Sequence, residues 1–162
     1  MLPRLHSPRK GWSIIQHLNE AQKAERDSEN LLGTLFSRKD PLRLRTGSII
    51  TVTSWNNADK ASTTVFSGVL MGIRRRGVDT AFRLRNIINR LGIEIQFKVL
   101  SPLIKEIKVV RRAQKGTNKG SVKALRQANA YYLRDRPELL RNLAGALKAD
   151  RVEAAQQAGR SA

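Results

Sequence analysis

The fold is indicated most clearly by the stretch Ile93-Glu94-Ile95-Gln96-Phe97-Lys98-Val99. Apolar and polar residues alternate along it without a break, which is the pattern of a β-strand with one buried and one exposed face. We predict that its odd-numbered positions face a core and that its even-numbered positions face solvent or a binding partner. Pro102 should break the pattern, because proline has no backbone N–H to donate to a neighbouring strand.

The sequence on both sides of this stretch has the same β-like character. β-branched and aromatic residues dominate short runs, and turn-forming residues separate these runs. We therefore expect four further strands, at residues 48–55, 63–73, 82–85 and 104–110. Because these runs follow one another with no helical pattern between them, they favour a small antiparallel barrel over residues 42–112 in a mainly β protein.

The segments before the expected barrel have a different pattern. Residues 12–33 are expected to form a helix, because apolar residues recur at helical spacing and Gly33 can end it. Residues 1–11 form a basic tail. The tail fits an organelle-targeting remnant and a basic arm that lies on RNA equally well.

The segments after the expected barrel are basic and then helical. Residues 113–130 have linker composition and no periodicity, and we expect a flexible basic insertion. Residues 131–162 form a C-terminal extension with one helix, whose start Asp135 can cap and whose apolar face is rich in leucine.

The charge balance is strongly one-sided. Lys and Arg number 31 and Asp and Glu number 13, so the formal net charge is +18. A free domain gains nothing from this self-repulsion, and a polyanionic partner would relieve it. Nucleic acid is the favoured partner, and an anionic membrane surface is the alternative.

The basic residues concentrate in two stretches. From Arg74 to Arg112 there are eleven Lys or Arg and three acids, and three arginines stand next to one another at an expected turn. Such a run is best explained by phosphates between the guanidinium groups. The flexible insertion would order on RNA as counterions are released. The alternative, that both stretches are solvated surface, stays open.

The residues expected to bind RNA are these: Arg74, Arg75, Arg76, Arg83, Arg85, Lys105, Lys108, Arg111, Arg112, Lys115, Lys119, Lys123, Arg126 and Arg134. Aromatic residues are few, so base stacking on a sheet surface has little support. Phe66, Phe82 and Phe97 are expected in the core. Tyr131 and Tyr132 either contact a partner or pack back on the barrel.

No pattern for catalysis or metal binding is recognisable. The sequence has no cysteine and only His6 and His17, so we expect no metal and no cofactor. Glu94 is expected at the surface, paired with an arginine, and Ser101 has no histidine placed to serve it. We conclude that the chain is not an enzyme. A small hydrolase and a peripheral membrane protein remain as weaker alternatives, and a free regulatory or chromatin-like nucleic-acid-binding protein is the main one.

Several motifs together resemble one family. They are Phe66-Ser67-Gly68-Val69-Leu70, Arg74-Arg75-Arg76-Gly77, Thr80-Ala81-Phe82-Arg83-Leu84-Arg85, Leu91-Gly92-Ile93-Glu94, Leu100-Ser101-Pro102, Val109-Val110-Arg111-Arg112 and Tyr131-Tyr132-Leu133-Arg134-Asp135. In this order and spacing, over about Trp12 to Asp135, the sequence resembles bacterial-type ribosomal protein L19.

The resemblance implies a fold and a set of partners. The expected fold is an SH3-like antiparallel barrel with an N-terminal helix and a C-terminal helical extension. The expected role is a structural constituent of the large ribosomal subunit that binds its rRNA. Neighbouring ribosomal proteins, including L14, and small-subunit rRNA across an intersubunit bridge are the implied partners, and no membrane is implied.

The sequence departs from the family pattern in three places. It has a basic tail, a longer basic insertion over residues 114–129 and an extension past Asp135. Such additions resemble organellar members of the family. They lead us to expect a ribosome of the mitochondrial matrix, with a bacterial cytoplasmic or plastid ribosome as the alternative.

Overall fold

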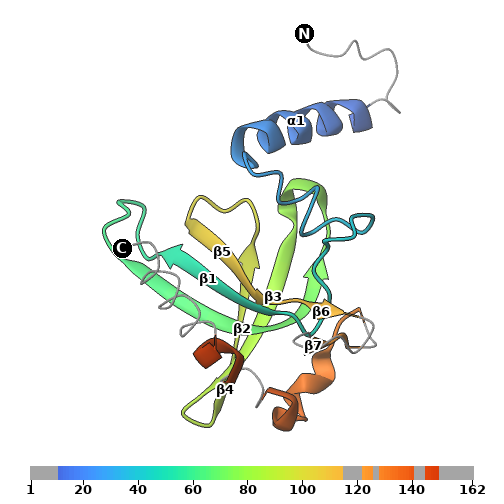
Figure 1. Ribbon diagram of the computed structural model, residues 1–162. Helices are drawn as coiled ribbons and strands as arrows, with labels where there is room; N and C mark the ends of the chain where they lie inside the picture. The colour runs from blue at the N-terminus through green and yellow to red at the C-terminus, as the bar shows by residue number, and fades with distance from the viewer. Residues whose placement is uncertain (1–10, 115–121, 126–127, 141–144, 150–162) are drawn as a thin grey trace, which may run out of the picture.

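The computed structural model describes residues 11–114, 122–125, 128–140 and 145–149. Within them the protein is mainly β, as expected, with one long helix at the N-terminal side (Figure 1). The elements in chain order are α1 (Gly11–Arg26), β1 (Ile49–Trp55), β2 (Thr63–Arg74), η2 (Gly77–Asp79), β3 (Ala81–Ile88), β4 (Leu91–Lys98), β5 (Ile104–Arg111), β6 (Ala113–Gln114), β7 (Val122–Lys123), η3 (Tyr131–Arg134) and η4 (Pro137–Leu140).

Strands β1 to β5 form one antiparallel sheet in the order β4-β3-β2-β1-β5. The sheet curls around a hydrophobic core and gives the small SH3-like barrel that the sequence predicts (Figure 1). The turn between β3 and β4 contains only Asn89 and Arg90, both with positive φ. Two such residues make the tight turn whose twist matches that of the strands, and this sets the register of the hairpin.

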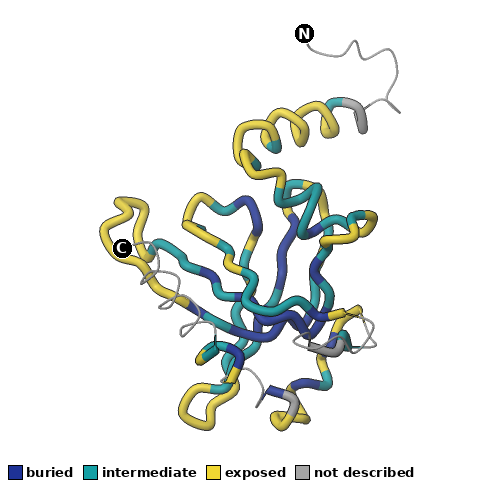
Figure 2. The backbone as a smooth tube through the Cα atoms, viewed as in Figure 1, coloured by how far each residue is buried: buried dark blue, intermediate teal, exposed yellow. Residues whose placement is uncertain are grey.

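The alternation in β4 has the predicted orientation. Ile93, Ile95 and Phe97 pack against the core, whereas Gln96 and Lys98 on the other face are exposed. The core also contains Phe66 and Phe82, as expected, and Phe82 packs against both Phe36 and Phe97. Figure 2 shows the buried positions concentrated in the strands, while α1 is mostly exposed.

A second apolar cluster lies on the opposite face of the sheet. Ile49, Val69 and Met71 point to this face, and Ala130 and Leu133 cover them. Both belong to residues 128–140, which we call the C-terminal segment. Burying a leucine in this way contributes about 2 kcal/mol. The C-terminal segment is therefore part of the folded domain, and it carries its polar residues to the edge of the sheet.

Two predicted helices differ from the structure. Helix α1 ends at Arg26 and does not continue to residue 33. The Asp27 carboxylate accepts hydrogen bonds from the backbone N–H groups of Leu31 and Leu32, which stabilises turns in place of a helix. Asp135 is the C-cap residue of the short helix η3, and the helix predicted after it is the short η4, which begins at Pro137 and has Glu138 in its first turn.

The basic insertion also differs from its prediction at both of its described ends. Strands β6 and β7 pair in parallel, so Ala113, Gln114, Val122 and Lys123 are not linker in conformation. Residues 115–121 and 126–127 lie outside the described part of the chain, as do residues 1–10 of the basic tail and residues 150–162 of the extension.

Candidate nucleic-acid interface

Five arginines line one cleft beside strands β2 and β3. The cleft has a volume of about 500 Å³. Its polar side chains belong to Arg38, Arg74, Arg75, Arg76, Arg83, Gln96, Asn129 and Tyr131. None of the described residues that line it is acidic. We call it the arginine cleft.

The arginines reach this cleft from three parts of the chain. Arg74 ends β2, and the two arginines that follow it lie in the turn before η2. Gly77 has a positive φ there, a conformation that favours glycine, so the chain can reverse. Arg83 lies on β3 opposite Gly72 of β2, and Arg38 comes from the loop that follows α1. Tertiary folding thus adds Arg38 and Arg83 to the three arginines that are adjacent in the sequence.

Arg75 is the most firmly held of these side chains. Its Nε donates a hydrogen bond of 2.6 Å to the carbonyl of Phe36, whose own side chain is buried. Burial lowers the pKa of Arg75, and the positive charges of Arg38 and Arg43 lower it further. Because a guanidinium group stays protonated in proteins, this cluster is a region of positive potential.

Asp79 is the acid nearest in sequence to the three adjacent arginines, and it forms its ion pair with Lys98, which does not line the cleft. The Lys98 ammonium lies 2.5 Å from its carboxylate, and both side chains are about 60% exposed. The hydrogen bond from Lys98, more than the nearby Arg76 and Arg74, lowers the pKa of Asp79. Exposed pairs of this kind contribute little to stability. Asp79 therefore leaves most of the charge of the cleft in place.

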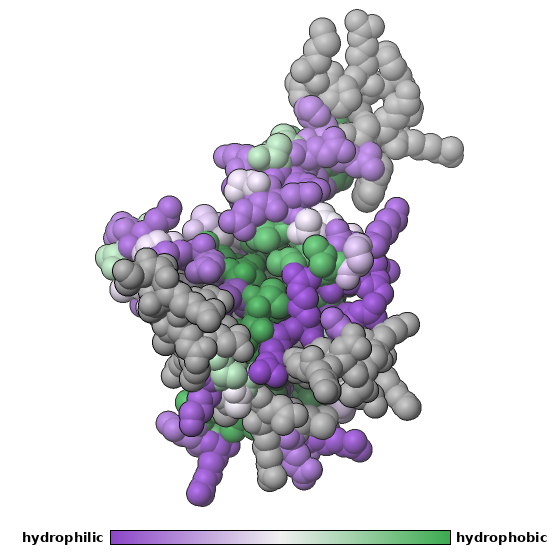
Figure 3. All heavy atoms as spheres, in the orientation of Figure 1, coloured by the Kyte–Doolittle hydropathy of each residue, from purple (hydrophilic) through white to green (hydrophobic). Residues whose placement is uncertain are grey.

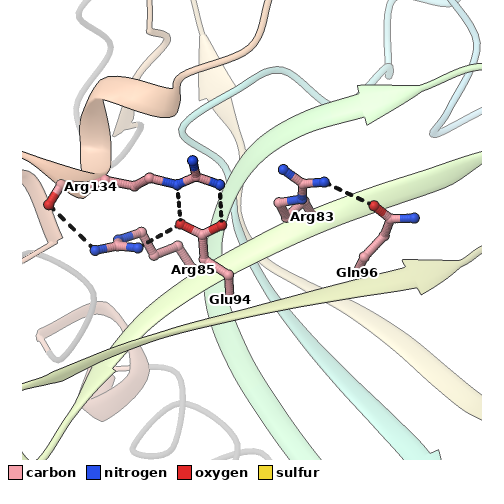
Figure 4. A network of polar contacts seen from close by, with 5 residues as sticks. All are labelled: Arg83, Arg85, Glu94, Gln96 and Arg134. Atoms are coloured by element: carbon pink, nitrogen blue, oxygen red, sulfur yellow. Dashed lines mark hydrogen bonds and ion pairs between the residues drawn. The ribbon is translucent and has the colours of Figure 1, made fainter.

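A second group of arginines surrounds Glu94 (Figure 4). Arg85 Nη1 lies 2.6 Å from Glu94 Oε1, and Arg134 donates two hydrogen bonds of 2.7 and 2.8 Å to the same carboxylate. These bonds, chiefly those from Arg134, lower the pKa of Glu94. The predicted pairing of Glu94 with an arginine is confirmed, and the pair also ties the C-terminal segment to the sheet.

The arginines around Glu94 are less suited to phosphate binding than those of the cleft. The side chain of Arg85 is only 12% exposed, and its Nη2 also donates to the carbonyl of Arg134. Among the described side chains, Arg85 Nε is a buried polar atom without a hydrogen-bond partner. Arg85 remains a predicted RNA-binding residue, but its geometry favours a structural role.

The remaining predicted residues lie along or beyond β5. Lys105 lies over the ring of Trp55, 4.9 Å from its centroid, and Lys108 is exposed. Arg112 donates a hydrogen bond of 2.6 Å to the carbonyl of Leu42, and Arg111 is half-buried. Of the residues in the insertion, Lys123 lies in β7, and three lie outside the described part of the chain: Lys115, Lys119 and Arg126.

Sequence reasoning missed several members of the cleft. Arg38, Gln96 and Asn129 were not singled out, and Tyr131 was left undecided. The apolar residues Leu31, Leu32, Leu35 and Phe36 anchor the loop that carries Arg38 against the core. They were the signal in the sequence that could have pointed to Arg38. Polar side chains share the cleft lining with apolar residues such as Met71, Ile73 and Phe82. On the face that Figure 3 shows, hydrophilic atoms surround an apolar centre.

Neither a metal site nor a membrane-spanning helix is present among the described residues. No group of three or more histidine, aspartate or glutamate side chains among them is placed to hold a metal ion. No helix in the same part of the chain is long and apolar enough to cross a bilayer.

Comparison with known proteins matches one family. The family model described as "Ribosomal protein L19" matches residues 24–142. Over 93 residues the chain is 38% identical to "Large ribosomal subunit protein bL19cy" of Arabidopsis thaliana and 37% identical to "Large ribosomal subunit protein bL19c" of Spinacia oleracea. Each match covers 57% of this chain and 36% of the relative, so the matched part spans about a third of either relative's length.

Proposed function

Because the chain belongs to the ribosomal protein L19 family, we propose that it is a structural constituent of the large ribosomal subunit that binds rRNA through the arginine cleft. A family of ribosomal proteins is a family of structural proteins, and the chain is not an enzyme. The observation that carries the proposal is the gathering of five guanidinium groups in one cleft with no acidic residue among its described lining.

The mechanism is the neutralisation of the cleft by phosphate groups. Arginine presents a planar fork of N–H donors that fits two phosphate oxygens at once. Arg75 is already oriented by its bond to the Phe36 carbonyl, so little side-chain freedom is lost when a phosphate binds beside it. Contacts of this kind fix the position of the protein on RNA, and the shape of the RNA supplies selectivity.

The proposal extends to partners and compartment. The basic residues of β5 and of the insertion would hold a second RNA segment, since β5 lies at the opposite edge of the sheet from β4. The family resemblance motivates a contact with ribosomal protein L14 and a contribution to a bridge with small-subunit rRNA. The added basic segments motivate the mitochondrial matrix as the site of the ribosome, with a plastid or bacterial ribosome as the alternative.

A charge-matched pair of variants tests RNA binding by the cleft. In the first, Arg74, Arg75 and Arg76 are all replaced by glutamine. In the control, Lys60, Arg90 and Arg136, which are exposed and do not line the cleft, are replaced by glutamine. Binding to purified large-subunit rRNA is measured at several salt concentrations. We expect the cleft variant to lose roughly two units of the log–log salt slope and the control to keep its slope.

Equal losses of salt slope in the two variants would show that only the total charge of the chain matters, and the cleft assignment would be wrong.

The alternative of a free nucleic-acid-binding protein is tested separately. Extracts are sedimented at low and high salt, and the distribution of the chain is followed by mass spectrometry. A ribosomal constituent stays with large subunits at high salt, whereas a free regulatory or chromatin-like protein is released from them.

A further inference from the structure

We propose that the Tyr131 end of the arginine cleft binds the base of one unpaired RNA nucleotide, while the arginines hold the adjoining phosphates. This inference rests on the proposed function, because it names the form of RNA that the cleft takes. The observation behind it is that an exposed aromatic ring and two amide side chains share the cleft with the five guanidinium groups.

Tyr131 is exposed where its neighbours are buried. Tyr131 is 48% exposed, whereas Ala130 and Leu133 are at most 1% exposed and anchor the segment on the sheet. Tyr132 packs against the same apolar cluster. Of the two adjacent tyrosines, one therefore stabilises the fold and the other presents its ring to the cleft. A solvent-facing ring on an anchored backbone is suited to stacking, because little freedom is lost when a base binds.

The Tyr131 ring is held in place by charged neighbours. The guanidinium of Arg134 lies 5.3 Å from the ring centroid, and the Glu94 carboxylate fixes that guanidinium through two hydrogen bonds. Arg83 lies 5.7 Å from the same centroid and is bonded to Gln96 at 3.1 Å. Arg83 donates one hydrogen bond to a neutral amide, whereas Arg134 donates two to a carboxylate, so Arg83 is the less constrained of the two arginines. Breaking that one bond would let Arg83 stack on a base, as guanidinium planes do in RNA complexes.

The amide side chains add donors and acceptors that phosphate alone does not need. A phosphate group accepts hydrogen bonds only, whereas the edge of a base offers both donors and acceptors, as the amides of Gln96 and Asn129 do. Asn129 approaches so closely that a Cβ on Gly72 would lie 2.3 Å from its Oδ1. Glycine at that position is what allows the amide to reach the cleft.

These features favour an unpaired nucleotide over a duplex. In a paired A-form helix the bases are stacked on one another, and an aromatic ring cannot reach their faces. A bulge or loop exposes a base face, and stacking on a ring tolerates any base. An acidic protein segment would satisfy the arginines, but it would leave the ring and the amides without a role.

The test uses the full chain and two RNA hairpins of equal length, one fully paired and one with a single bulged nucleotide. Tyr131→Leu removes the aromatic face and keeps the bulk, and Tyr131→Phe keeps the face and removes the hydroxyl. We expect Tyr131→Leu to weaken binding of the bulged hairpin roughly tenfold and to leave the paired hairpin unchanged. Tyr131→Phe should bind both hairpins as the parent does.

The outcomes separate this inference from the proposed function. If Tyr131→Leu weakens both hairpins equally or neither, the base site is wrong, while the glutamine variant of Arg74, Arg75 and Arg76 still tests the cleft. If that arginine variant binds both hairpins unchanged, the RNA-binding role itself is wrong. Should Tyr131→Leu perturb the fold, Tyr131→Trp decides, because a larger ring should bind the bulged hairpin at least as tightly as the parent. A glutamate-rich peptide that displaced both hairpins and lost its own binding in Tyr131→Leu would assign the site to a protein partner.

Discussion

Two groups of arginines lie beside the same sheet, and only one of them contains a carboxylate. Around Glu94, Arg85 and Arg134 share one carboxylate of the same chain, and this pairing holds the C-terminal segment in place. In the arginine cleft, five guanidinium groups face no acidic residue among the described lining. The comparison teaches that the count of basic residues does not show which of them bind a partner. The deciding feature is whether folding brings an acid to them.

The largest expected effect comes from removing two charges from the arginine cleft. Arg74→Gln with Arg76→Gln should weaken rRNA binding about 30-fold, because two charge-assisted contacts are lost. Arg85→Gln with Arg134→Gln removes the same charge, but it should weaken rRNA binding less than about threefold, because these two guanidinium groups are bonded to Glu94 and do not contact phosphate directly. Filter binding at fixed salt measures both. A larger loss in the second pair would reverse the comparison.

The next largest effect is on stability, and it comes from breaking the ion pairs around Glu94. Glu94→Gln leaves Arg85, whose side chain is 12% exposed, without its counter-charge. We expect the free energy of unfolding to fall by about 2 kcal/mol, since removing one partner of a largely buried pair strands the other. Urea unfolding followed by circular dichroism measures it. Asp79→Asn is the matched control, because it removes a carboxylate from an exposed pair and should leave the unfolding midpoint in place.

A third experiment gives the cleft the carboxylate that it lacks. Gln96 already accepts a hydrogen bond from Arg83 at 3.1 Å, so Gln96→Glu places an acid where the geometry fits a guanidinium. We expect rRNA affinity to fall about tenfold, because the new pair competes with phosphate inside the cleft. The stability should not fall. Glu106→Gln, a change of opposite charge outside the cleft, is the control, and an affinity unaffected by Gln96→Glu would show that phosphates do not enter at this point.

The sequence predicted the barrel well because its signals are local. Alternation along residues 93–99 identified both the strand and its buried face, since each depends only on neighbouring residues. The end of α1 was missed because it depends on hydrogen bonds that the backbone N–H groups of Leu31 and Leu32 donate to the Asp27 carboxylate. Competition of this kind between a side chain and the backbone helix is not visible in apolar spacing.

The candidate site was predicted only in part, for a different reason. The run of three arginines is visible in one stretch of sequence, and it does line the cleft. Its other members come from distant segments, since Arg38 and Tyr131 lie on opposite sides of the barrel in the sequence. Their approach depends on the loop anchored by Phe36 and on the segment anchored by Leu133. Composition could not separate these arginines from those that Glu94 neutralises.

The smallest expected effect is the pH dependence of the free energy of unfolding that comes from the ion pairs around Glu94. Hydrogen bonds from Arg134 and Arg85 hold the pKa of Glu94 below its ordinary value, which is about 4.3 in an unfolded chain. The resulting stability is fully present above that unfolded pKa and is lost as the pH falls through the lower pKa of the folded state. The free energy of unfolding of the parent chain should therefore decrease below about pH 4 more steeply than that of Glu94→Gln, which has no carboxyl to protonate there. Urea unfolding from pH 6 to pH 3 measures the two slopes.

Asp79 also contributes to the pH dependence in the same range, because Lys98 lowers its pKa. The comparison is therefore made in an Asp79→Asn background. Equal slopes in that background would mean that the arginines around Glu94 stabilise the fold by packing alone, and the contrast with the arginine cleft would no longer rest on charge.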